Sequence, residues 1–383
     1  MIRDLTDAEA RIALPCKWGE VDADVIPAWV AEMDYALAPP IVEALHEAVD
    51  ANLGGYPSFD IGGELGTAYA DFADRHFGHH VDPAHVIPIV DVTSGVRFAL
   101  DVLSDRAPMV MPGPAYAPQL AIAQITGRER VDLLVDADAE RAELDLDQLD
   151  ALFADGARTL LLTQPHNPWG RVFTREELEG IRDVVVRHRA RVITDEIHAS
   201  LVLPGAEHVP YLSLEGTAEH TVAVVATSKA FNTAGLRCAQ LVVPDPVARE
   251  RLLAAPTALN DSWSSLGAVA AVAAYTKGDE WLAALIERLD GQRQLLADLL
   301  ATHLPRARMR PLEATYLAWI DVRAYGHADP AAVALSQGRV RVAPGHDYQP
   351  GLEGHIRLNI ATSPERLTEI IHRLATALTA AAA

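Results

Sequence analysis

The sequence has few of the features that mark a secreted or membrane-embedded protein. It contains only two cysteines, Cys16 and Cys238, which are too few for a secreted disulfide framework. No apolar run is long enough to cross a bilayer. The first twelve residues include acidic side chains and no apolar segment, so we expect no signal peptide. These absences favour a cytoplasmic protein without a membrane partner.

Positive charge is also scarce. The chain of 383 residues has 32 Lys and Arg residues against 53 Asp and Glu residues, for a formal net charge of -21. Nucleic acids and anionic membranes attract basic surfaces, so neither is an expected partner. The simplest consequence of the charge is solubility. The sequence also shows no internal repeat and no low-complexity linker.

Between about Val86 and Val243 the sequence alternates short apolar runs with amphipathic stretches. Strands are expected near residues 86–90, 109–111, 159–162, 192–194, 222–225 and 241–243. One helix is expected to begin at Thr174, because Glu177 three residues later completes a capping box. The alternation predicts an α/β fold, with a mostly parallel sheet and helices on both of its faces.

The pattern changes after about Asp261. Helical segments dominate through Leu304, and two strand-like segments, 316–322 and 355–360, precede a closing helix from Pro364. This order predicts a smaller α+β domain at the C-terminus. We expect an N-terminal arm (1–50) that joins the small domain, a large domain (51–270) and a small domain (271–383).

Only three of the basic residues are lysines, namely Lys17, Lys229 and Lys277. Lys17 lies in a polar N-terminal segment, and Lys277 lies in a sequence typical of an exposed turn. Lys229 instead follows an apolar strand, and open α/β sheets bind ligands at the carboxyl ends of their strands. Burial there would lower the pKa of the amine and leave it ready to attack an aldehyde. A lysine that only extends from a strand end to solvent is the alternative.

An aldehyde cofactor that carries a phosphate needs an anion cradle. Thr93, Ser94, Gly95 and Val96 lie between a strand and a helix, where glycine permits close approach and helix N–H groups bind phosphate. Ser228 beside the lysine and Arg237, eight residues after it, could add a hydroxyl and a guanidinium. Arg237 lies in an otherwise apolar run, so we expect it to be buried with an anion partner.

A pyridine ring in the cofactor needs further contacts. Asp195 ends a strand, and its carboxylate could hold the ring nitrogen protonated, although it could also cap a helix. Asn167, in a turn-rich loop, could donate to a ring oxygen. Tyr116, near two prolines, could stack on the ring or only fix its loop. Arg357 alternates with apolar neighbours, so it points away from the core, toward a substrate carboxylate or toward solvent.

Together these segments resemble the fold-type I pyridoxal-phosphate enzymes, and more closely the cystathionine β-lyase branch often called the MalY/PatB family. The resemblance covers nearly the whole chain and rests on ordered blocks: 27–35 (PAWVAEMDY), 55–57 (GYP), 165–172 (PHNPWGRV), 195–198 (DEIH) with Gly205, His208 and Pro210 after it, 227–236 (TSKAFNTAGL), 313–319 (EATYLAW) and 357–361 (RLNIA). Each block is modestly specific, and their shared order is strongly specific.

The resemblance implies that Lys229 binds pyridoxal 5′-phosphate covalently, that Asp195 pairs with the pyridine nitrogen, and that Tyr116 stacks on the ring. Asn167 then contacts the ring oxygen, with His198 near it. The residues expected around the phosphate are Gly95, Val96, Ser228, Arg237 and the neighbouring subunit's Tyr56. Arg357 is expected to bind the substrate carboxylate. No metal is expected, and a homodimer is implied.

The activity implied by this resemblance is β-elimination from L-cystathionine or a related cysteine S-conjugate, which gives a thiol, pyruvate and ammonia. An aminotransferase is the alternative, because the two reactions share their early steps and general aminotransferases have an arginine at the position of Arg237. A regulatory protein that acts by binding a partner is a third interpretation. It is disfavoured because the catalytic set is intact and no DNA-binding segment is visible.

Overall fold

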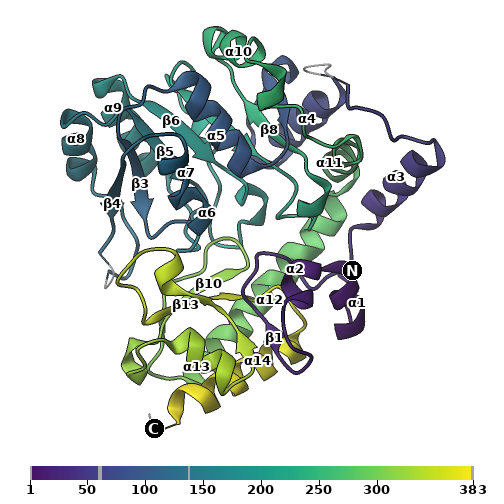
Figure 1. Cartoon of the computed structure of the whole chain (residues 1–383), viewed down its shortest axis with the longest axis vertical. Coiled ribbons are helices and arrows are strands. Elements are labelled where there is room, and N and C mark those ends of the chain that lie inside the picture. The colour runs from purple at the N-terminus through teal and green to yellow at the C-terminus, as the bar shows by residue number, and fades with distance from the viewer. Residues whose placement is uncertain (1, 59–62, 137–138, 381–383) are drawn as a thin grey trace.

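A seven-stranded sheet forms the centre of the larger part of the molecule (Figure 1). The computed structural model describes residues 2–58, 63–136 and 139–380. In spatial order the strands are β2 (Val86–Ile89), β8 (Ala239–Val242), β7 (Thr221–Val225), β6 (Arg191–Asp195), β5 (Thr159–Thr163), β3 (Met109–Gly113) and β4 (Arg130–Leu134). Strand β8 is antiparallel to both neighbours, and the other pairings are parallel. The predicted mostly parallel sheet is confirmed.

Helices cover both faces of this sheet. Successive strand residues point to opposite sides, so the apolar strands present hydrophobic side chains on each face. Leu161 and Ile193 pack in a hydrophobic core with α5 (Val92–Leu103) and α10 (Pro246–Leu253), whereas Leu160 and Val192 pack with α8 (Leu146–Ala154) and α9 (Arg175–His188). The expected capping box before α9 is present, with both reciprocal hydrogen bonds. Further helices of this part are α4 (Glu64–Phe77), α6 (Ala117–Leu120), α7 (Ile122–Ile125) and α11 (Ser265–Lys277).

The C-terminal part contains a four-stranded antiparallel sheet. Its strands, in spatial order, are β12 (Ala343–Pro344), β13 (His355–Asn359), β10 (Leu317–Asp321) and β9 (Arg308–Met309). The helices α12 (Asp279–His303), α13 (Pro330–Ser336) and α14 (Pro364–Thr379) accompany this sheet (Figure 1). Within the described ranges, no helix is both long and apolar enough to cross a membrane.

The N-terminal segment lies against the C-terminal part. It contains α1 (Asp7–Ala13) and α2 (Pro15–Gly19), and its strand β1 (Ile26–Pro27) pairs in parallel with β11 (Val340–Arg341). The following helix, α3 (Pro39–Asp50), packs instead against α11 of the larger part. The division into an arm and two domains at residues 50 and 270 stays a prediction.

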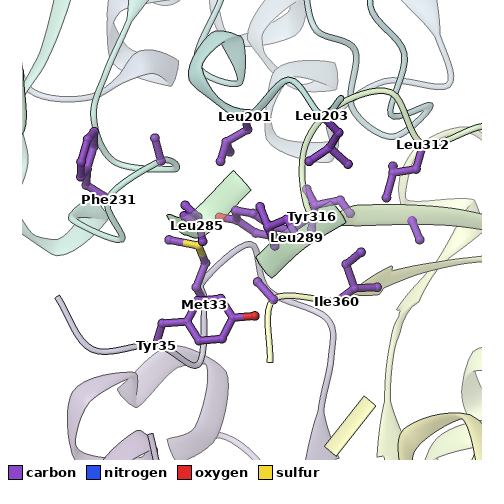
Figure 2. Packing of buried hydrophobic residues seen from close by; sticks show 14 of the residues in the cluster. Met33, Tyr35, Leu201, Leu203, Phe231, Leu285, Leu289, Leu312, Tyr316 and Ile360 are labelled. Atoms are coloured by element: carbon purple, nitrogen blue, oxygen red, sulfur yellow. The ribbon is translucent and has the colours of Figure 1, made fainter. Parts of the chain in front are cut away.

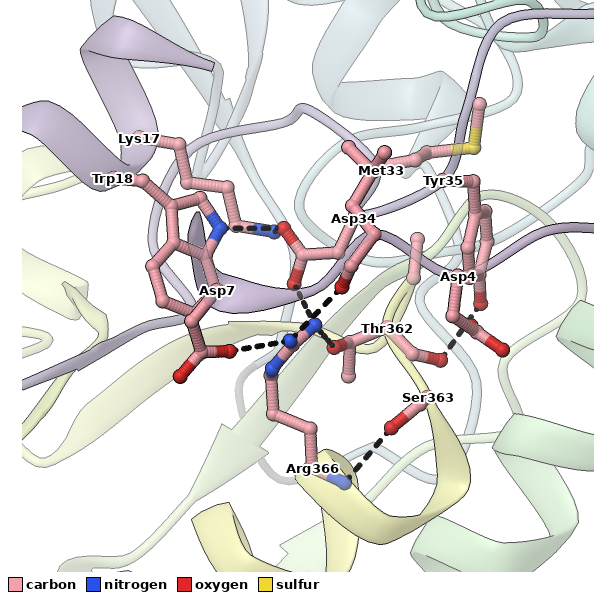
Figure 3. Close-up of polar contacts among 12 residues, drawn as sticks. Asp4, Asp7, Lys17, Trp18, Met33, Asp34, Tyr35, Thr362, Ser363 and Arg366 are labelled. Atoms are coloured by element: carbon pink, nitrogen blue, oxygen red, sulfur yellow. Dashed lines mark hydrogen bonds and ion pairs between the residues drawn. The ribbon is translucent and has the colours of Figure 1, made fainter. Parts of the chain in front are cut away.

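A buried ion pair fixes this segment in place (Figure 3). Lys17, which the sequence places in a polar segment, has polar partners but is only 1% exposed. Its Nζ lies 2.8 Å from Asp34 Oδ1, which also accepts a hydrogen bond from Trp18 Nε1 at 2.7 Å. The other carboxylate oxygen of Asp34 accepts from Arg366 of α14 at 3.4 Å. An unpaired lysine would be costly at this depth, so Asp34 stabilises the buried charge of Lys17. The contact between Asp34 and Arg366 then holds the arm on α14.

Apolar packing continues from this ion pair toward the centre of the molecule. Figure 2 shows Met33 and Tyr35 of the N-terminal segment in the same buried cluster as Leu201, Leu289 and Tyr316. These side chains come from the arm, the larger part, α12 and the C-terminal part. Met33 and Tyr35 of the arm therefore lie where the parts of the fold meet.

Candidate active site

A cavity of about 380 Å³ opens at the carboxyl ends of β5, β6 and β7. This is the edge at which open α/β sheets bind ligands. Seven of the eleven residues predicted from the sequence line it, namely Tyr116, Asn167, Asp195, His198, Ser228, Lys229 and Arg237. The predicted strand ends therefore converge on one site.

Lys229 lies four residues beyond the end of β7 and is half-buried in this cavity. Its Nζ donates to the backbone carbonyl of Ala31 at 3.0 Å. Burial, followed by the positive charge of Arg357, lowers the pKa of the amine to about 8. A substantial fraction of the amine is therefore neutral at mildly alkaline pH, as a nucleophile or base requires.

Asp195 is the last residue of β6 and is 3% exposed. Its carboxylate accepts hydrogen bonds from Gln119 Nε2 at 2.6 Å and from the Ile197 N–H at 3.1 Å. Burial nevertheless raises its pKa to about 6. A nearby cation, such as a protonated ring nitrogen, would keep this carboxylate ionised.

Gln119, in α6, is a site residue that the sequence did not predict. It is 1% exposed, and its Oε1 accepts from Thr163 Oγ1 at 3.1 Å while its Nε2 donates to Asp195. The amide therefore fixes the orientation of the carboxylate. Nothing in the local sequence distinguishes it from a surface glutamine, because the contact depends on how α6 folds over β5 and β6.

Glu196, next to Asp195, supports the same strand end from behind. It is 4% exposed and accepts hydrogen bonds from Thr194 Oγ1 at 2.7 Å, Gln164 Nε2 at 3.0 Å and the Tyr211 N–H at 3.0 Å. Burial alone would raise its pKa, but these bonds and His208 hold it below its usual value. The Glu196 carboxylate thus has a structural role, because these hydrogen bonds tie it to the surrounding segments.

Arg357, on β13, is 4% exposed, so the solvent-facing alternative was wrong. Its Nη1 donates to Asn167 Oδ1 at 3.2 Å and its Nη2 to the Trp29 carbonyl at 2.7 Å. Its Nε is buried with no hydrogen-bond partner among the described residues. The guanidinium also lies over the Tyr348 ring, with 4.9 Å to the centroid. The face that the alternation identified as outward is covered by the rest of the fold.

His198 and Tyr116 complete the ring region of the cavity. His198 is 2% exposed, and burial together with the charges of Lys229 and Arg357 lowers its pKa to about 3. It is therefore neutral, and its Nδ1 has no hydrogen-bond partner in the described part of the chain. Tyr116 is half-buried, and burial raises its pKa. Both present a neutral ring to the cavity.

The predicted phosphate region is arranged differently from the expectation. Gly95 and Val96 lie inside α5, and Val96 is fully buried in the hydrophobic core. A Cβ on Gly95 would lie 2.1 Å from Ile89 Cδ1, so the glycine is needed for helix-to-sheet packing. Thr93 and Ser94, the two residues that directly precede Gly95, line the cavity together with Ser228.

Arg237 corrects a second expectation. Its side chain is 58% exposed rather than buried, because it follows a 3₁₀ turn at a left-handed φ of 55°. It does have an anion partner, since its Nη1 lies 2.8 Å from Asp91 Oδ2. Asp91 also caps α5 by accepting from the Ser94 N–H at 2.8 Å. The guanidinium thus lines the mouth of the cavity.

Tyr56 does not line this cavity within a single chain. It is 95% exposed on a segment held by a 2.9 Å hydrogen bond from Ser265 Oγ to the Gly55 carbonyl. So large an exposed aromatic suits contact with another molecule. Its place in a neighbouring subunit's site stays a prediction.

Comparison with known proteins agrees with this geometry. The family model described as aminotransferase class I and II matches residues 24–374. A cystathionine beta-lyase of Corynebacterium glutamicum is 34% identical over 366 residues, which cover 94% of this chain and 96% of that protein. Cystathionine beta-lyase PatB of Bacillus subtilis is 32% identical, with 93% of each chain covered.

A solved structure agrees as well. The crystal structure of cystalysin from Treponema denticola, which contains a pyridoxal 5′-phosphate cofactor, superposes with a TM-score of 0.92 at 26% identity and covers 99% of both chains. The resemblance stated from the sequence blocks is confirmed, and this chain belongs to the aminotransferase class I and II family.

Proposed function

We propose that this protein is a pyridoxal-phosphate-dependent carbon-sulfur lyase that acts on L-cystathionine or a related cysteine S-conjugate. The products would be a thiol, pyruvate and ammonia. The observation that carries the proposal is the meeting of the Lys229 amine and the buried Asp195 carboxylate in one cavity. The activities of the similar proteins support the same reaction.

The side chains of the cavity fit the cofactor. Asp195 is a buried carboxylate with no cationic side chain bonded to it in the described residues, which suits a protonated pyridine nitrogen. Lys229 offers an amine for the aldehyde, and Asn167 and Tyr116 line the same space. His198 Nδ1 and Arg357 Nε are buried without partners in the part of the chain that the structure describes, so polar groups remain available for bound molecules.

The chemistry divides between cofactor and chain. Pyridoxal phosphate supplies an aldehyde for the substrate amine and a ring that withdraws electrons from the substrate Cα. Asp195 would hold the proton at the ring nitrogen, and Arg357 would bind the substrate carboxylate through its guanidinium. Lys229 would take the Cα proton as a base, after which the β-sulfur leaves with its bonding electron pair as a thiolate.

An aminotransferase remains the second candidate, since the family itself is described by that activity. The two functions diverge once the Cα proton has been removed. Purified enzyme mixed with L-cystathionine and no keto acid tests the difference. A lyase releases pyruvate continuously, whereas an aminotransferase converts each cofactor once and stops. A single stoichiometric turnover would therefore reject the proposed function.

The enzyme is inferred to be cytoplasmic and homodimeric, with Tyr56 reaching the neighbouring subunit's cofactor phosphate. The inferred partner is a small amino-acid substrate rather than a nucleic acid or a membrane. Light scattering of the purified protein would test the dimer directly.

A further inference from the structure

A short backbone segment, residues 29–33, lies beside the catalytic amine, and we call it the strap. All five of its carbonyl groups accept hydrogen bonds from side chains of other segments. The pairs are Trp29 with Arg357 (2.7 Å), Val30 with Asn359 (2.6 Å), Ala31 with Lys229 and Tyr316 (3.0 Å each), Glu32 with Lys17 (3.0 Å) and Asn359 (2.6 Å), and Met33 with Asn232 (2.9 Å). The strap is therefore fixed from several sides.

The two lysines that donate to the strap differ in how their charges are balanced. Two lysines donate to adjacent carbonyls, Lys229 to Ala31 and Lys17 to Glu32. The charge of Lys17 is balanced by Asp34 at 2.8 Å. Within the described residues the structure gives Lys229 no such direct salt bridge. The catalytic amine thus has a carbonyl acceptor and no bonded counter-ion.

The Glu32 side chain is the obvious source of that counter-charge. Glu32 is half-buried, and its Oε2 is buried with no hydrogen-bond partner among the described residues. It is the next residue after Ala31, whose carbonyl holds the Lys229 amine. Burial raises the pKa of Glu32, and Lys229 is the charge that opposes this rise most strongly. In return, Glu32 favours the charged amine more than Asp195 does.

We propose that Glu32 is a positioning residue for the catalytic amine: its carboxylate stabilises Lys229 as an ammonium on the strap side of the cavity after the amine has accepted the substrate's Cα proton. One proton moves from Cα to Nζ, and the electron pair of the broken C–H bond stays on the substrate, where it forms the Cα–Cβ double bond as the β-thiolate leaves. The inference rests on the proposed function for the identity of the base. Asp195 is unsuited to this role because that function commits it to the ring nitrogen.

Other charges face the same two groups and must stay constant in a test. The groups that act on Lys229, besides Glu32, are Arg357, Asp195, Cys16 and His198. Those that act on Glu32, besides Lys229, are Lys17, Asp34, Cys16 and Tyr316. Glu32→Gln keeps the size of the side chain and removes only its charge, so it isolates the proposed effect.

Because the chain has only three lysines, the titration of the Lys229 amine can be measured separately from that of the other two. Lys277→Arg removes the exposed lysine of α11, and Lys17 is 1% exposed in its salt bridge. In that background, trinitrobenzenesulfonate labelling of the full chain after cofactor removal, followed by peptide mass spectrometry, gives the pH dependence of Lys229 alone. The pH titration of the visible absorbance of the holoenzyme is a second readout. Neither readout requires turnover.

Glu32→Gln should lower the apparent pKa of the Lys229 amine by about one unit, because an opposite charge is lost. Glu32→Asp should give a smaller shift in the same direction. Glu20→Gln is the matched control, since Glu20 lies in the same region but contacts Arg341, and it should leave the pKa unchanged.

Two results would overturn the proposal: an unchanged pKa in Glu32→Gln, or an equal shift in Glu20→Gln. If Glu32→Gln does not fold, a Glu32→Asp variant in which the Lys229 amine keeps its parent pKa would also overturn the proposal. If Glu32→Gln lowers the pKa of the Lys229 amine as expected but the parent enzyme releases no pyruvate, the proposed function is rejected. The assignment of Glu32 to the amine would still stand.

Discussion

At the scale of single residues, the proposed function assigns the substrate carboxylate to Arg357 and so predicts that this residue governs the affinity for the substrate. Its Nη atoms hold Asn167 and the strap, and its buried Nε has no partner in the described part of the chain. Lysine cannot reproduce a forked array of donors. We expect Arg357→Lys to raise the KM for L-cystathionine about 10-fold or more, with a smaller change in kcat.

Steady-state pyruvate release measures this prediction. Arg373→Lys is a suitable control. Arg373 is on α14, where it contacts Glu369 and the Asp24 carbonyl, and none of these residues lines the cavity. A KM that stays at the parent value while kcat falls would show that Arg357 does not bind the substrate carboxylate.

The site could be predicted in part from single residues. Lys229 and Asp195 follow apolar runs, so their positions at strand ends are visible in the sequence. Gln119 was missed because a buried amide carries no local signal. The Ala31 carbonyl was missed because backbone groups are the same at every position. Arg237 was misjudged because its left-handed backbone, which turns the side chain outward, is not encoded in the apolar pattern.

At the scale of elements, the contact between α5 and the sheet depends on Gly95. A Cβ at this position would lie 2.1 Å from Ile89 Cδ1 and 3.2 Å from Val224 Cγ1. We expect Gly95→Ala to destabilise the fold by about 1–3 kcal/mol through overpacking, measured as a lower midpoint of thermal or urea unfolding.

The matched control is Gly291→Ala in α12. Nothing lies within 4 Å of a Cβ at Gly291, so alanine there should stabilise the helix by about 0.5–1 kcal/mol. If Gly95→Ala were as stable as the parent chain, the packing explanation for this glycine would be wrong.

Elements that are buried along their whole length were easier to predict than very short or partly exposed elements. The interior strands β5, β6 and β7 are buried along nearly their whole length, so their apolar runs stand out. Strand β4 lies at the sheet edge and is largely half-buried, so its sequence lacks such a run. The strands β9, β11 and β12 have two residues each and are defined only by the partners with which they pair.

At the scale of the whole molecule, the proposed dimer makes a specific prediction for Tyr56. If Tyr56 completes the neighbouring subunit's site, Lys229→Ala and Tyr56→Ala chains are each inactive or nearly so as homodimers. A hybrid dimer of the two contains one intact site. Chains unfolded together in equal amounts and refolded with cofactor should therefore recover about a quarter of the parent pyruvate production.

Separately refolded variants, mixed only at the end, serve as the control. No recovery in the co-refolded sample would mean that Lys229 and Tyr56 do not serve one site from different subunits. This outcome would leave the fold and the cavity unchanged and would remove the argument for an obligatory dimer.

The proposed function depends on Lys229 as the residue that carries the cofactor. Reduction of the purified holoenzyme with sodium borohydride fixes the cofactor on the amine to which it is bound, and peptide mass spectrometry then locates it. We expect a single modified lysine at Lys229, in a peptide that spans the end of β7. Modification at Lys17 or Lys277, or a chain without any bound cofactor, would contradict it.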